Sequence, residues 1–137
     1  MIVADTGAVL ALIDADDRHH ETLTAVFRED AASWLLPGAV LPEVDYVIGT
    51  HLGTWAQDAF LSDLDRGEWT FDWGGEADLR RANEIATRYR ALRLGLVDAA
   101  VIASAERLRA TAIATLDLRH FGSVAIRGRP RLIPRDL

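Results

Sequence analysis

Short apolar segments alternate with segments of helical periodicity along the chain, and this alternation restricts the fold more than any other feature. Apolar or alternating runs predict strands at residues 2–4, 33–36, 68–73 and 111–114, with weaker candidates at 124–126 and 132–133. Helical spacing predicts helices at residues 6–14, 17–29, 39–52, 54–65, 76–92 and 97–109. Strands that alternate with helices form a parallel sheet with right-handed crossovers, so the pattern predicts an α/β fold.

The composition restricts the classes of protein that remain. With 137 residues and no linker or repeat, the chain is expected to form one domain with a proper core. It has no apolar run long enough to span a membrane and no signal-peptide pattern at its start, which favours a cytoplasmic protein. The absence of cysteine excludes disulfides, thiol catalysis and thiolate metal sites.

Charge is distributed unevenly along the chain. Residues 1–79 hold 16 Asp and Glu against 3 Arg, whereas residues 80–137 hold 5 against 12, and no Lys occurs anywhere. Arginine makes planar contacts with phosphate, so a basic second half could guide a nucleic-acid backbone. The alternative is that Arg80, Arg81, Arg88, Arg90 and Arg93 only form a solvated helix face.

Four carboxylates stand at the edges of apolar segments, where a soluble protein rarely places a charge. Asp5 follows Ile-Val-Ala and Asp117 follows Ala-Ile-Ala, while Glu43 and Asp98 lie inside apolar runs near predicted helix starts. Acids after parallel strands share the carboxyl edge of the sheet, and the two helix positions can face the same edge. Because converging buried carboxylates repel one another, they indicate a divalent cation, Mg²⁺ or Mn²⁺. Helix capping is the alternative role for Asp5, and a turn role for Asp117.

Four stretches carry a family resemblance over nearly the whole length. They are IVADTGAVLALID followed by DDRHH, LPEVDYVI ahead of Gly53, LGLVDAAVIASAERL, and ATLDLRHF. In this order and spacing the chain resembles small PIN-domain proteins, and more narrowly the VapC-type toxins of bacterial toxin–antitoxin pairs.

The resemblance implies a single PIN domain over residues 1–137, folded as a three-layer α/β/α sandwich with a central, mainly parallel sheet. It implies Mg²⁺- or Mn²⁺-dependent RNA cleavage by metal-activated water, with Asp5, Glu43, Asp98 and Asp117 as catalytic metal ligands. It also implies a homodimer inhibited by a small antitoxin.

Several neighbouring residues receive supporting roles or none. Thr115 could bond a ligand carboxylate or a phosphate oxygen, and Thr6 could also cap the helix, which would leave Asp5 freer to be a ligand. All four histidines are predicted to lie on the surface or cap helices rather than bind metal. The core is predicted to contain Phe121 and the strand tryptophans Trp34, Trp69 and Trp73, whereas Trp55 suits an interface or a stacked base.

Apolar helix faces in the acidic half exceed what one sheet surface needs. They are Val9-Leu10-Ile13, Leu23-Val26-Phe27 and Leu52-Trp55. One interpretation is a groove for an amphipathic antitoxin segment whose Arg pairs with the four acids. The other is that these faces serve only the core and the homodimer.

Three rival classes fit part of the pattern. Asp5-Thr6-Gly7-Ala8 is also the signature of aspartic proteases, which are all-β, whereas this chain has a mainly helical pattern. Phosphatases of the haloacid dehalogenase type need a second Asp two residues after the first, and Gly7 stands there. A binding module without activity would need no cluster of four acids.

Overall fold

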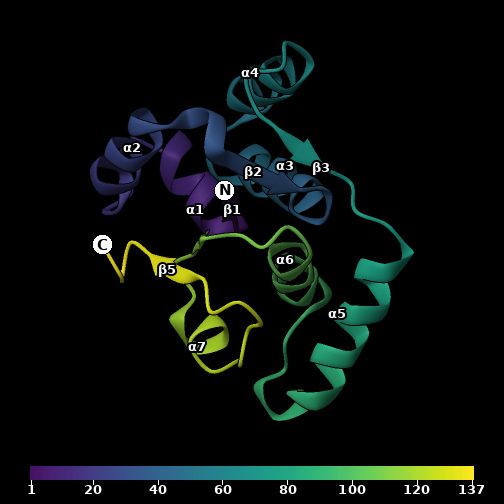
Figure 1. Ribbon diagram of the computed structural model, residues 1–137. Coiled ribbons are helices and arrows are strands. Elements are labelled where there is room, and N and C mark those ends of the chain that lie inside the picture. Colours follow the sequence, from purple (N-terminus) through teal and green to yellow (C-terminus); the bar gives the residue numbers. More distant parts are fainter.

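Five parallel strands form one sheet at the centre of the computed structural model, which describes residues 1–137 (Figure 1). Their order across the sheet is β3-β2-β1-β4-β5. The register pairs Val3 of β1 with Leu35 of β2 on one side and with Ile113 of β4 on the other. The strands are β1 (Ile2–Ala4), β2 (Trp34–Pro37), β3 (Phe71–Asp72), β4 (Ala112–Ala114) and β5 (Arg131–Ile133).

Seven helices cover the two faces of the sheet, giving a three-layer α/β/α sandwich. From β1 the chain first moves outward to β2 and β3, then returns to β4 and continues to β5. Because crossovers are right-handed, this reversal places α1–α4 on one face and α5–α7 on the other, as Figure 1 shows. The helices are α1 (Thr6–Ile13), α2 (His20–Glu29), α3 (Leu41–His51), α4 (Thr54–Asp65), α5 (Glu76–Arg88), α6 (Leu96–Arg107) and α7 (Leu118–Phe121).

The core lies on both faces of the three central strands. Every residue of β2 and β4 is buried, as are Val3 and Ala4 of β1. Helix α6 lies against β1 and β2 and is buried at Ala99 and along Val101–Ala105. It is covered on its other side by α5. A helix covered on two sides is expected to be apolar around most of its surface, which explains the weak amphipathicity of its sequence.

The predicted α/β fold is confirmed, and most elements lie where the sequence places them. Helix α4 has the predicted bounds, and α1 and α6 agree within two residues. Helix α2 begins three residues later than predicted, and residues 38–40 form a 3₁₀ turn before α3. Residues 124–126 are not a strand, whereas the weak candidate at 132–133 is part of β5. The largely helical structure rules out the all-β protease alternative.

The predicted strand at residues 68–73 is the largest disagreement. Only Phe71 and Asp72 pair with β2, at the edge of the sheet. Trp69 packs on Phe27 and Phe60 as a core-facing residue, but Trp73 is 71% exposed, so its predicted place in the core is wrong. Because the strand is only two residues long, Trp69 and Trp73 lie outside it and do not share the one face that the alternation predicts for a longer strand.

Candidate metal centre

The crevice between β1 and β4 is the point where the chain reverses its winding direction. The connection from β1 leads to β2 on one side, and that from β4 leads to β5 on the other. In open parallel sheets, ligands bind beyond the strand ends at such a point. Asp5 directly follows β1, and its backbone N–H donates to the carbonyl of Ala114 at the end of β4, at 2.9 Å. Asp117 lies three residues after Ala114, at the same edge of the sheet.

The carboxylate of Asp5 is held on both oxygens. Oδ1 accepts from the backbone N–H of Thr6 at 2.8 Å, so of the two possible caps of α1 the structure uses Asp5 and not Thr6. Oδ2 accepts from the hydroxyl of Thr115 at 3.0 Å, which is the contact expected of that threonine. Thr115 Oγ1 also accepts from the backbone N–H of Asp117 at 3.1 Å. One fully buried hydroxyl therefore links the two strand-end acids.

Asp98 and Asp117 meet on the side chain of His120. Asp98 lies in the first turn of α6, and Asp117 is the N-cap of α7, where its Oδ1 accepts from the backbone N–H of His120 at 3.0 Å. His120 Nδ1 lies 2.7 Å from Asp98 Oδ2 and 3.1 Å from Asp117 Oδ2. One atom from each of these three residues falls within 4.8 Å of the others.

Glu43 completes the set from the opposite helical layer. Its apolar sequence neighbours Val40, Val44 and Val47 predict that it points into the interior, but it lies in the first turn of α3 with an exposed side chain, so this prediction is wrong. It nevertheless faces the acids, because it lines the same open pocket of about 780 Å³. The lining residues are Asp5, Thr6, Gly7, Leu10, Glu43, Val47, Asp98, Leu116, Asp117, Leu118 and Arg119. The four acids chosen from the sequence thus share one pocket.

The electrostatics of this pocket favour a positive occupant. Burial raises the pKa of Asp5 to about 6, although the hydrogen bond from Thr115 lowers it, and the charges of Asp98 and Glu43 raise it further. Burial also raises the pKa of Asp98, against the opposing effect of His120, and Asp117 and Glu43 add to the increase. Both carboxylates are harder to ionise than usual because burial and their neighbours disfavour negative charge. A cation would remove this penalty.

The donor set fits a divalent cation. Four carboxylates supply the hard oxygen ligands that Mg²⁺ and Mn²⁺ take in proteins. A second observation points the same way: Thr6 lines the pocket and is only 6% exposed, and its buried hydroxyl has no hydrogen-bond partner. A buried hydroxyl without a partner is costly, so it indicates a ligand, a bound water or a phosphate oxygen at this place.

Histidine 120 is the site residue that sequence reasoning missed. The sequence predicts a surface or capping role for all four histidines, and this is wrong for His120, whose ring contacts two of the acids. The others do not contact the acids: His19 accepts from Arg18, while His20 and His51 bond backbone carbonyls. The sequence does contain one signal for this contact: His120 lies three residues after Asp117, which places both side chains on one helical turn.

Most of the contacts made by the α5 arginines are structural. Arg81 bonds Glu106 and Glu84, and Arg80 contacts Glu76. Arg88 lies over the Tyr89 ring. Arg119 differs, because it lines the acid pocket and has no carboxylate within ion-pair distance. Arg119 is therefore the arginine that lies beside the four acids.

Comparison with known proteins identifies the fold family. Residues 2–126 match the family model described as the PIN domain. The chain belongs to the PIN domain family. A curated relative, Ribonuclease VapC26 of Mycobacterium tuberculosis, is 34% identical over 123 residues, which cover 90% of this chain and 91% of the relative.

Solved structures agree with the PIN-domain fold. The Mycobacterium tuberculosis toxin VapC20, which cleaves the sarcin–ricin loop, superposes with a TM-score of 0.73 at 19% identity, covering 82% of this chain and 87% of that one. Rickettsia felis VapBC2, solved with a fragment of promoter DNA, superposes with a TM-score of 0.66 at 16% identity, covering 96% of this chain and 97% of that one. At these identities the likeness shows the fold alone. No helix of this PIN domain is long and apolar enough to cross a bilayer.

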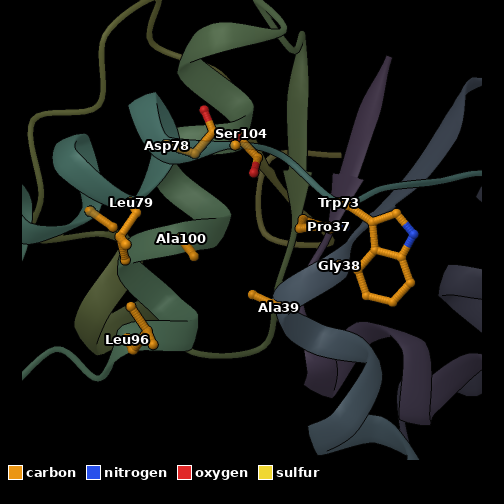
Figure 2. A pocket seen from close by; sticks show the side chains of 11 residues that line it. Pro37, Gly38, Ala39, Trp73, Asp78, Leu79, Leu96, Ala100 and Ser104 are labelled. Carbon is orange, nitrogen blue, oxygen red and sulfur yellow. The ribbon is translucent and has the colours of Figure 1, made fainter.

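A second hollow of about 160 Å³ lies away from the acids of the PIN domain (Figure 2). Trp73, Leu79 and Leu96 line it together with the residues before α3. Its one acid, Asp78, is bound by Arg107 Nε at 2.9 Å. The acid of this hollow is therefore engaged in an ion pair, unlike the four acids at the strand ends.

Proposed function

We propose that this single PIN domain of residues 1–137 is a metal-dependent endoribonuclease and the toxin of a toxin–antitoxin pair. The observation that carries the proposal is the shared pocket of Asp5, Glu43, Asp98 and Asp117 beside the unpartnered hydroxyl of Thr6. The ribonuclease named among its relatives, which matches over nine-tenths of the chain, supports RNA as the substrate.

The four acids would hold Mg²⁺ or Mn²⁺. When bound, such a cation supplies an activated water at neutral pH and stabilises negative charge on the phosphate. Thr115 would keep Asp5 Oδ2 oriented toward the pocket by the hydrogen bond it already donates. The Thr6 hydroxyl would donate to a phosphate oxygen or a bound water, which satisfies its unmet bond.

The experiment that tests this function is cleavage of RNA by the purified protein. We expect products with 5′-phosphate and 3′-hydroxyl ends, loss of cleavage in EDTA, and recovery with excess Mg²⁺ or Mn²⁺. Mapping RNA 5′ ends in cells after brief induction would then identify the target. Cleavage that persists in EDTA would contradict the proposal.

Arg119 is expected to hold the RNA backbone in place. Arg119→Ala should weaken RNA binding several-fold and reduce the salt dependence of binding by about one phosphate contact, because one guanidinium is lost from the pocket rim. Binding isotherms at several salt concentrations measure both effects.

The matched control for this prediction is Arg28→Ala, on the exposed surface of α2 and outside the pocket. It should leave affinity and salt dependence unchanged. Equal losses in the two variants would mean that only overall charge matters.

An antitoxin would act at the same acids. We propose that an Arg of the partner pairs with the carboxylates and competes with the cation, because a guanidinium relieves the same repulsion. The groove expected from three helix faces has little support, since Val9 and Leu23 are completely buried and serve the core. Leu10 does reach the acid pocket, and Trp55 is 73% exposed.

Expression with and without the neighbouring gene tests the toxin role. Induced alone, the protein should arrest growth, and co-expression of the partner should restore it and yield a co-purifying complex. We also propose a homodimer, which sedimentation measures directly. A harmless protein that binds no neighbouring product would contradict the toxin role and leave the nuclease proposal standing.

A further inference from the structure

The ring of His120 contacts two acids of the cluster, with a hydrogen bond between Nδ1 and Asp98 Oδ2. Its side chain is mostly buried, and Nδ1, rather than Nε2, faces Asp98 and Asp117. The N-cap of α7 fixes this arrangement, because the backbone N–H of His120 holds Asp117 Oδ1 and leaves Oδ2 to face the ring. The ring is therefore oriented by the backbone as well as by the acids.

The spacing of the donor atoms fits neighbouring positions around one cation. In octahedral coordination with metal–ligand distances of about 2.1 Å, adjacent donors lie about 3 Å apart. The observed separations from His120 Nδ1 are 2.7 Å to Asp98 Oδ2 and 3.1 Å to Asp117 Oδ2. The unpartnered, buried Thr6 hydroxyl independently indicates that the pocket receives a ligand.

We infer that His120 is an additional metal ligand, and that its nitrogen makes the site prefer a first-row transition cation such as Mn²⁺ over Mg²⁺. The inference rests on the proposed function, because it refines the metal site assigned there. Mg²⁺ selects oxygen ligands, whereas imidazole suits transition metals, whose affinities for nitrogen-containing sites exceed that of a purely hard cation. Four acids alone would distinguish the two ions weakly.

His120→Asn tests the inference, because the shorter amide can place an oxygen near the position of Nδ1 and so exchanges the donor. Mn²⁺ and Mg²⁺ affinities are measured by titration calorimetry on the full-length protein. We expect Mn²⁺ to bind about tenfold more weakly to the variant and Mg²⁺ to change less than about twofold. His51→Asn, on the exposed end of α3, is the control and should change neither affinity.

Pulsed electron paramagnetic resonance of the Mn²⁺ complex reads the ligand directly. The wild type should show ¹⁴N coupling that changes on ¹⁵N-histidine labelling, a readout that needs no variant, and His120→Asn should lack it. Absence of nitrogen coupling in the wild type, or an unchanged ratio of Mn²⁺ affinity to Mg²⁺ affinity in the variant, would overturn the inference and leave the nuclease proposal intact. A wild type that binds neither ion would overturn both.

Discussion

Replacing Asp98 by Asn is expected to abolish RNA cleavage while the protein stays folded. The amide keeps the shape of the side chain but removes the negative charge, which weakens its binding to the proposed cation. We expect kcat/KM to fall by at least about 100-fold, since loss of metal affinity and loss of transition-state stabilisation act together. A gel assay of RNA cleavage over a range of Mg²⁺ or Mn²⁺ concentrations, up to saturation, measures both effects.

The control for Asp98→Asn is Asp58→Asn, an exposed acid of α4 outside the pocket. It should retain full activity, and circular dichroism should show the same helical content in both variants. Activity of Asp98→Asn within tenfold of the wild type would exclude Asp98 from the catalytic site.

Asp5→Asn is expected to stabilise the metal-free protein even though it should inactivate the enzyme. In the folded chain the pKa of Asp5 is raised to about 6, against 3.8 without these surroundings. Between pH 3.8 and about pH 6, Asp5 is protonated more often in the folded state than in the unfolded state. The contribution of Asp5 to the free energy of unfolding therefore falls as pH rises from about 4 to about 6, by up to about 3 kcal/mol, and stays low above pH 6.

Thermal unfolding of Asp5→Asn in EDTA tests whether the substitution stabilises the metal-free protein. At pH 7.5 the variant should melt several degrees above the wild type, and the difference should shrink toward pH 4. The amide oxygen can still accept from Thr6 N–H, so the cap of α1 is kept. Excess Mg²⁺ or Mn²⁺ should raise the melting temperature of the wild type and not that of the variant. A variant less stable than the wild type at pH 7.5 would show that Asp5 is not under electrostatic strain.

The strands and helices with strong patterns were predictable, and those at the sheet edges were not. Buried β1 and β4 are short apolar runs, and α4 has clear start and end signals at Thr54 and Asp65. At the edge, Trp69, Phe71 and Trp73 follow one alternating pattern, yet only Trp69 reaches the core. Which side of an edge strand is covered depends on helices distant in sequence, and α2 and α4 decide it here through Phe27 and Phe60.

The four acids could be chosen from sequence because each interrupts an apolar segment, which carries a cost that requires compensation. The sequence could not predict how deeply each acid is buried. Asp5 is almost fully buried and Glu43 is exposed, although both lie near the start of a helix. His120 escaped notice because its role depends on meeting Asp98, a residue of another helix. Contacts between elements have no local signature.

The hydrogen bond between Thr115 and Asp5 joins residues 110 positions apart, and this separation has a consequence for protein synthesis. A nascent chain carries Asp5 and Glu43 early, but β1 lacks its neighbour β4 until the ribosome has made most of the chain. Asp117 and His120 follow still later on α7. The pocket can therefore assemble only near the end of translation, because an incomplete chain that lacks α7 also lacks Asp117 and His120.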